Sequence, residues 1–457
     1  MARRYRVKGK GLLLRAAAAM DSKKIIQYPT DTIVTVAKEA TVGETDRAYV
    51  VAASMPEGGA AERFDEGVSA VVGWGSMRVL ELLDDDALLE LREDETLPPP
   101  LPTDRSPPRP FGARRDGLGI SEYCDSETRA MLEARNRTMG PPESLLDVPA
   151  DVLRGLLDAD NFKYAPPPPE AKIFTADAVK DGAKLTVYAP PHDESSLPAV
   201  VFAHGGGFMS GSRRHVDGLC RELAVRAAVA VVSVEYRLAP EHPFPAGLDD
   251  VRSAVSYCRG SPALPNAGTI DGARVALAGE SAGANLAHVA ALLARDDDDD
   301  ESDGEGETPP NALPKKPWLR CELLCTPQLG LRCDERSVAE YGHGHFLTRE
   351  FLDYVREVAY RERRDDWRVA PLDAVTAKTL DLDGFATPTL ILAAELDPLA
   401  DQAFLYHDAL LAAGAPSELW LARGTVHAFL NNAAAASRRD AGLDKAAAYL
   451  RAHLYGS

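Results

Sequence analysis

The 457-residue chain is too long for one ordinary globular core, so we expect two or three domains. Hydrophobic residues make up 45% of the chain, which excludes a disordered protein, and the net charge of -19 argues against nucleic acid or an anionic membrane as a partner. Because no apolar run approaches the roughly 18 residues that cross a bilayer, we predict a soluble protein without a membrane span.

The first residues, "MARRYRVKGKGLLLRAAAAM", combine basic residues with a short apolar patch, but Arg15 interrupts that patch and weakens a signal-peptide interpretation. We expect a cytoplasmic protein, with an organellar transit peptide as the open alternative. The six cysteines contain no CxxC pair, which favours reduced, buried thiols over disulfides or a metal site.

Residues 1–84 consist of short strand-like runs separated by turn residues, which predict a small all-β barrel. The runs "YRV", "GLLLRAAAAMDSKKI", "YPTDTIVTV" and "GWGS" follow one another in the order of a bacterial-type SH3-like domain, which this region resembles. The resemblance implies a protein or peptide partner for the barrel. Trp74 is then either an aromatic that contacts this ligand or, as tryptophans more often are, a packed core residue.

Prolines mark the boundary of this first region. The stretch "LPPPLPTDRSPPRP", residues 97–110, allows neither a regular helix nor a central strand. We therefore divide the chain into the barrel at 1–84, a proline-rich linker at 85–115 and a larger domain at 116–457.

The larger domain alternates strands with amphipathic helical stretches, which predicts an α/β fold with a mostly parallel sheet and helices on both faces. A hairpin should turn at Asp181 and Gly182. The dense acidic run within 296–316 is expected to form a solvated, disordered loop. The predicted buried strands are "AVVFAH", "VAVVSVEY", "RVALAGE", "CELLCT", "TLILAAE" and "ELWLAR".

Two largely helical regions, Glu122–Asp160 and Phe346–Ala370, fall outside this alternation. Such helices beside a sheet predict either a cap over its active edge or additional packing of the core.

The stretch "VALAGESAG" contains the pattern GxSxG between a predicted strand and a predicted helix. Ser281 lies at its centre, flanked by Gly279 and Glu280 on one side and by Ala282 and Gly283 on the other. Alone, this pattern is weak, but a strand-turn-helix context is the structural test for a nucleophile elbow. We therefore take Ser281 as the candidate nucleophile.

A serine nucleophile needs a base, and the base needs an orienting carboxylate. Asp397 and His427 each follow a later predicted strand, in the order expected for this kind of site. Glu395 should still lie at the strand end, and Asp401 should cap the next helix, so Asp397 is preferred. His288, His407 and His453 lie in helical patterns and are interpreted as packed or surface residues.

The run of glycines after the strand "AVVFAH" can supply the oxyanion hole, because backbone N–H groups reach a substrate oxygen only where no side chain intervenes. Gly205 and Gly206, together with Ala282 directly after the nucleophile, are the candidate donors. His204 and Gly207 flank them as supporting residues. A flexible turn would explain the glycines but not the serine pattern downstream.

Together these motifs make the larger domain similar to the hormone-sensitive-lipase-like branch of the α/β-hydrolases, which includes plant carboxylesterases and arylacetamide deacetylase. The matching motifs, in family order, are "HGGGFMSGS", "VEYRLAPEHPFPAGLDD", "GESAG", "DPLAD" and "VHAF". The family usually has Asp where this chain has Glu280, and Gly where it has Ala428. Glu241 and Tyr236, within the second motif, receive no chemical role.

The resemblance implies a serine hydrolase with a helical cap that cleaves esters with short or small aromatic acyl groups through an acyl-enzyme. It implies a small-molecule ester substrate, no cofactor and no metal. Two alternatives stay open: a non-catalytic small-molecule receptor on the same fold, as in the gibberellin receptors, which lack the base, and an interaction protein acting through the SH3-like barrel.

Overall fold

The computed structural model describes eight strands between Arg3 and Leu82 and most of the chain from residue 119 to residue 456. Within the later part, the segments 140–144, 147, 170–172, 192–195, 265–267, 301–317, 334, 361–362 and 365 lie outside the described residues. The predicted proline-rich linker and most of the predicted acidic loop also lie outside them.

The N-terminal strands form one antiparallel sheet in the order β6-β3-β2-β7-β5-β4-β1-β8. The turns between these strands lie outside the described residues, so the SH3-like interpretation stays a prediction. The strands are β1 (Arg3–Val7), β2 (Leu12–Arg15), β3 (Lys24–Tyr28), β4 (Ile33–Val42), β5 (Thr45–Ser54), β6 (Glu62–Arg63), β7 (Gly73–Ser76) and β8 (Leu80–Leu82).

The larger unit is built on a second eight-stranded sheet in the order β16-β15-β14-β13-β11-β12-β10-β9. Strands β9, β10 and β12 pair antiparallel, and the other pairs are parallel. The strands are β9 (Phe174–Lys180), β10 (Ala183–Ala189), β11 (Ser196–Ala203), β12 (Ala230–Glu235), β13 (Thr269–Glu280), β14 (Leu319–Cys325), β15 (Thr389–Ala394) and β16 (Ser417–Ala422).

All six predicted strands are present, but β16 lies at the edge of the sheet, so its first four residues are half-buried or exposed instead of buried. Residues 199–203 of β11 are fully buried, as expected for a central strand of a parallel sheet whose two faces are both covered. The predicted hairpin is also present, because β9 and β10 pair across Asp181 and Gly182, both of which have positive φ.

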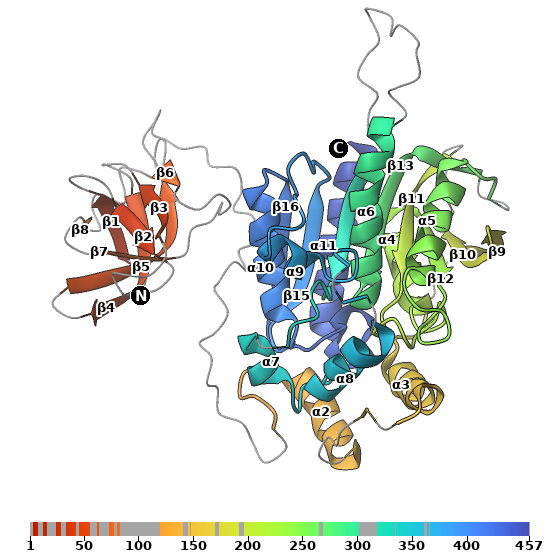
Figure 1. Ribbon diagram of the computed structural model, residues 1–457, viewed down its shortest axis with the longest axis horizontal. Helices are drawn as coiled ribbons and strands as arrows, with labels where there is room; N and C mark the ends of the chain where they lie inside the picture. The colour runs from red at the N-terminus through yellow and green to blue at the C-terminus, as the bar shows by residue number, and fades with distance from the viewer. Residues whose placement is uncertain are drawn as a thin grey trace, which may run out of the picture. The chain divides into compact units, whose positions relative to one another are not determined.

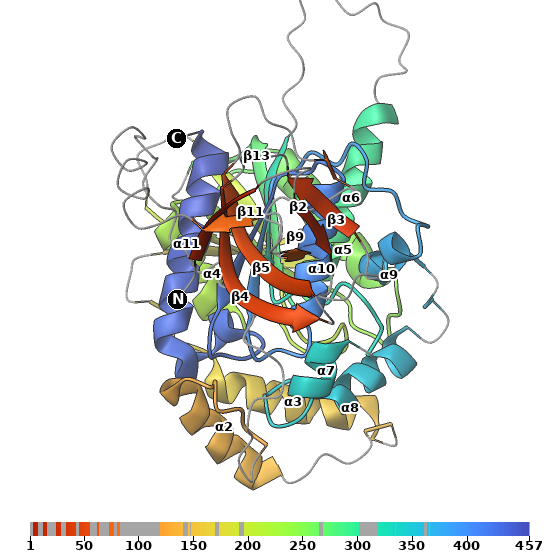
Figure 2. The ribbon, with the colours of Figure 1, turned by 90° about the vertical axis from the view of Figure 1, so that its left-hand side faces the viewer.

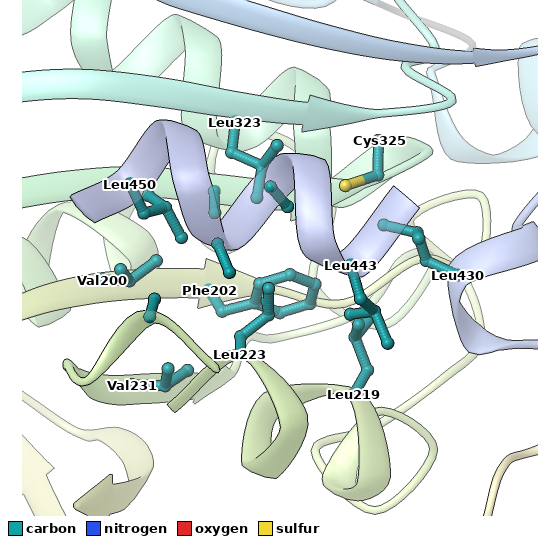
Figure 3. Close-up of a cluster of buried hydrophobic side chains, with 14 of the residues drawn as sticks. Val200, Phe202, Leu219, Leu223, Val231, Leu323, Cys325, Leu430, Leu443 and Leu450 are labelled. Carbon is teal, nitrogen blue, oxygen red and sulfur yellow. The ribbon is translucent and has the colours of Figure 1, made fainter. Parts of the chain in front are cut away.

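Helices cover both faces of this sheet (Figure 1). On one face, α4 (Asp217–Ala227) and α11 (Ala436–Tyr455) pack onto the strands, and Phe202 of β11 lies between Leu219 and Leu223 of α4 and Leu443 of α11 (Figure 3). The other face carries α5 (Ala246–Arg259), α6 (Ala282–Asp300) and α10 (Ala400–Ala412). The predicted layers are therefore confirmed.

Further helices gather at one end of the sheet and form a cap (Figures 1 and 2). These helices are α2 (Ser126–Met139), α3 (Ala150–Tyr164), α7 (Arg336–Tyr341), α8 (Arg349–Tyr354) and the π-helical turn η3 (Val355–Ala359). The short elements α9 (Pro371–Thr376), η4 (Phe429–Asn431) and η5 (Ala433–Ala435) connect parts of the unit.

Two boundaries differ from expectation. Helix α6 continues to Asp300, so its end is helical where the sequence predicted the start of the acidic loop. The second helical region ends at Ala359, because Tyr360 turns to contact the Phe208 and Phe244 rings and Asp366 closes a turn onto Arg368.

In the described part of the chain, no helix has the length and apolar character that a membrane span requires.

Candidate active site

Ser281 lies on a tight turn between the end of β13 and the start of α6, at φ 56°. This left-handed conformation is unfavourable for a non-glycine residue and is characteristic of a nucleophile elbow. The two glycines of the motif are required by close packing. A Cβ atom on Gly279 would overlap the backbone of Gly283, and one on Gly283 would overlap the carbonyl groups of Ala203 and His204.

The structure brings Ser281, His427 and Asp397 together in one hydrogen-bonded row. His427 Nε2 lies 2.8 Å from Ser281 Oγ, and His427 Nδ1 lies 2.8 Å from Asp397 Oδ2. The other carboxylate oxygen of Asp397 accepts the backbone N–H of Leu399 at 2.9 Å. All three side chains are buried. This is the geometry in which a histidine can remove a serine proton while a carboxylate holds its tautomer.

The electrostatic surroundings of His427 favour its cationic form. Burial alone lowers its pKa, but the charge and hydrogen bond of Asp397, together with the charge of Glu280, outweigh burial, so the net pKa is raised. An imidazolium that forms during a proton transfer from Ser281 is therefore stabilised in place.

The glycine run follows β11 and passes directly over the nucleophile. A Cβ atom built on Gly205 would lie 3.4 Å from Ser281 Cβ. Gly206 has φ 126°, and a Cβ atom there would overlap the Ser210 carbonyl, while Gly207 at φ 60° would place one 2.7 Å from the Phe351 ring. The positions of Gly206 and Gly207 therefore favour glycine over any residue with a side chain.

The backbone N–H groups of Gly205, Gly206 and Ala282 have no acceptor among the described residues. They are available to bind an anionic oxygen next to Ser281, which is the geometric requirement of an oxyanion hole.

Residues of the "VEYRLAPEHPFPAGLDD" segment hold this loop in place. Tyr236 stacks on the His204 ring with centroids 4.1 Å apart and donates its hydroxyl to the His204 carbonyl at 2.9 Å. Glu241 pairs with Arg154 of α3, which in turn donates to the carbonyl oxygen of Met209 at 2.6 Å. The segment therefore joins the cap to the glycine loop.

A cavity of about 900 Å³ opens above Ser281, between the sheet and the cap. Its wall contains an ion pair between Arg135 of α2 and Asp160 of α3, 2.8 Å apart, with the Arg135 guanidinium over the Phe346 ring. Apolar side chains from the cap and the core make up much of the remaining wall, among them Leu145, Leu157, Tyr164, Leu347 and Phe351. A cavity of this size accommodates a small organic molecule.

The alternative acids and histidines lie away from the nucleophile. Glu395 follows the end of β15 and binds Arg423 and the N–H of Gly424. Asp401 is the second residue of α10 and accepts the N–H of Ser337, so the prediction that it caps this helix is wrong.

The alternative histidines are packed residues. His288 is fully buried between Glu322 and Tyr406, His407 pairs with the Ser417 hydroxyl, and His453 packs against Tyr449.

A family model described as alpha/beta hydrolase fold matches residues 200–431. The chain belongs to this family. Two curated relatives come from Mycobacterium tuberculosis. Carboxylic ester hydrolase LipN is 34% identical over 264 residues, which are 58% of this chain and 65% of LipN. Carboxylesterase NlhH is 35% identical over 275 residues, which are 58% of this chain and 77% of NlhH.

Solved structures support the same family. A thermostable esterase from Pseudomonas putida superimposes with a TM-score of 0.62 at 26% identity, over 73% of this chain and 98% of that chain. A hyperthermophilic esterase from the archaeon Pyrobaculum calidifontis gives a TM-score of 0.58 at 26% identity, over 72% of this chain and 98% of that chain. The α/β-hydrolase unit is therefore matched over nearly the whole length of these esterase chains.

Sequence reasoning missed several residues of the site. The Arg135–Asp160 pair and Arg154 are contributed by cap helices whose partners are distant in the sequence, and no motif marked them. The two residues that end and follow η4, Asn431 and Asn432, also line the cavity. In the sequence, only their position a few residues after His427 indicated that they could lie near the site.

Proposed function

We propose that this chain hydrolyses carboxylic esters with Ser281 as nucleophile, His427 as general base and Asp397 as the group that orients the imidazole. Ser281 Oγ attacks the ester carbonyl carbon while His427 takes the hydroxyl proton. The oxyanion is bound by the N–H groups of Gly205, Gly206 and Ala282. His427 then gives its proton to the leaving alkoxide, so that an alcohol departs and an acyl-enzyme remains.

Deacylation repeats these steps with water. His427 removes a proton from the water as it attacks the acyl carbon, and it returns the proton to Ser281 Oγ when the ester bond to the enzyme breaks. The products are a carboxylic acid and an alcohol, and the enzyme is restored. Apart from the ester and water, every group that takes part in these steps belongs to the chain.

The observation that carries this proposal is the pair of 2.8 Å contacts that joins Ser281, His427 and Asp397 at the floor of the cavity. Membership in the family and the carboxylesterase relatives support ester hydrolysis as the reaction. We further propose that the acyl groups are short or small and aromatic.

An ester panel tests the proposal. We expect turnover of p-nitrophenyl acetate and butyrate, a decline with longer acyl chains, and a decrease of kcat/KM by several orders of magnitude in Ser281→Ala. The matching anilides show whether amides are also cleaved. Tight binding of small esters without turnover by the wild type would instead indicate a receptor.

A further inference from the structure

Glu280 is the last residue of β13 and directly precedes Ser281. Its side chain is only 4% exposed and lines the cavity together with Ser281 and His427. One of its carboxyl oxygens, Oε2, is buried without a hydrogen-bond partner. A buried carboxyl oxygen without a hydrogen-bond partner destabilises the fold, so its presence beside the nucleophile calls for a physical explanation.

The carboxyl group also lies against the glycine loop. A Cβ atom built on Gly205 would be 3.1 Å from Glu280 Oε1 and 3.3 Å from the Glu280 carbonyl oxygen. Glu280 therefore lies next to the loop that supplies two of the candidate oxyanion donors, and it lines the same cavity as the base.

The other titratable groups around Glu280 do not carry charge near neutral pH. Burial raises the pKa values of Cys220 on α4, Cys325 on β14 and Tyr236 after β12, and burial lowers the pKa of His204 to about 4. Among the described residues, His427 is thus the titratable group whose charge acts on Glu280.

We infer that Glu280 is a positioning residue for the ester hydrolysis proposed above. The charge of its carboxyl group acts electrostatically on the His427 imidazole, so that the protonation state of each side chain depends on that of the other. This inference rests on the proposed function only for its kinetic consequence. The coupling itself is a property of the folded chain.

The signs of the coupling follow from the charges. Burial raises the pKa of Glu280 to about 7, an effect opposed by the charge of His427. The Glu280 anion in turn contributes to the raised pKa of His427. As pH falls, Glu280 takes up a proton and its attraction for the imidazolium disappears, so the second proton binds less readily to His427. The two groups titrate together over a broad range instead of in one sharp step.

The pH profile of kcat/KM tests this inference. Glu280→Gln keeps the size of the side chain but removes its negative charge, which contributes to the raised pKa of His427. The acid limb of the kcat/KM profile should therefore move to lower pH and become the narrower curve of a single titrating proton. At the pH where the wild type retains half of its maximal kcat/KM, the Gln variant should retain clearly more than half of its own maximum. Glu280→Asp, which restores a carboxylate, should move the limb back toward the wild-type position.

Glu235→Gln is the matched control, because Glu235 ends β12 at the same edge of the sheet, two strands from β13. The pKa of His427 responds to Asp397 and Glu280, so this control should leave the acid limb in place. A Glu280→Gln profile that superimposes on the wild type overturns the inference. A uniform loss of activity at all pH values also overturns it, since that would mean a purely structural role.

A second readout does not require turnover. In the Ser281→Ala protein, the imidazole of His427 is titrated by NMR, assigned with His427→Gln, and the titration is repeated after Glu280→Gln. We expect a lower His427 pKa in the Gln variant, and an unchanged pKa refutes the coupling. A shifted pKa in a protein whose wild type hydrolyses no ester would uphold the coupling while refuting the proposed function.

Discussion

Replacing Asp397 by Asn should nearly abolish hydrolysis, and the surrounding hydrogen bonds explain why. Asp397 Oδ1 accepts the Leu399 N–H at 2.9 Å, while Oδ2 accepts from His427 Nδ1 at 2.8 Å. In the Asn variant, the Leu399 N–H retains the carbonyl oxygen, so the amide NH2 must face His427. Nδ1 of the imidazole must then accept a hydrogen bond from this amide, so the imidazole carries its proton on Nε2. Because Nε2 faces Ser281 and is already protonated, it cannot remove the proton of the serine hydroxyl.

The expected loss of kcat/KM is about 10⁴-fold, the size of the tautomer effect in Ser-His-Asp hydrolases. This corresponds to about 5 kcal/mol of transition-state stabilisation. Initial rates with p-nitrophenyl butyrate near neutral pH measure it. Asp401→Asn is the matched control, because Asp401 lies four residues later and binds Ser337 instead of the imidazole. If Asp397→Asn kept more than a tenth of the wild-type kcat/KM, the assigned role of Asp397 would be wrong.

Three further changes test other parts of the structure. Gly206→Ala should lower kcat about 10²-fold or more and also lower the free energy of unfolding in urea, because its Cβ atom overlaps the Ser210 carbonyl, strains the backbone and displaces an oxyanion donor; an unchanged kcat would contradict this. Tyr406→Phe should lower the free energy of unfolding in urea by about 1–3 kcal/mol, since it leaves the buried His288 Nε2 without its 2.6 Å partner, and equal stability would count against that bond. Removal of residues 1–110 should leave a folded esterase with kcat/KM within about threefold of the full chain, whereas an insoluble product would refute the proposed domain division.

The larger sheet could be predicted because its strands are locally encoded. Five consecutive fully buried residues in β11 require an uninterrupted apolar run, and that run is visible in the sequence. The glycine positions were predictable for a related reason, since close backbone approaches and positive φ angles restrict the residue type at single positions.

The cap could be predicted only in outline. Helical patterning continued beyond Ala359, but the contacts of Tyr360 with the Phe208 and Phe244 rings end the helix there. The bond from Arg154 to the Met209 carbonyl likewise joins segments 55 residues apart. Tertiary contacts of this kind override local preference and leave no periodic signal in the sequence.

The candidate triad was proposed from its motif and from chain order. The environment of Glu280 could not be predicted in this way. The sequence shows a glutamate directly before the serine, but the burial of its carboxyl group and its distance from the Gly205 position depend on how β11 and β13 pair in the folded chain.

The measurement that tests the central claim most directly is mass spectrometry of the protein after reaction with a p-nitrophenyl organophosphate, which phosphorylates an activated serine and releases p-nitrophenol. The account predicts one stable adduct per chain, located by peptide mapping on Ser281, with activity lost in proportion and no adduct in Ser281→Ala. A fully inactivated enzyme whose adduct lies on another residue, or an active enzyme that carries a stoichiometric adduct on Ser281, would contradict it.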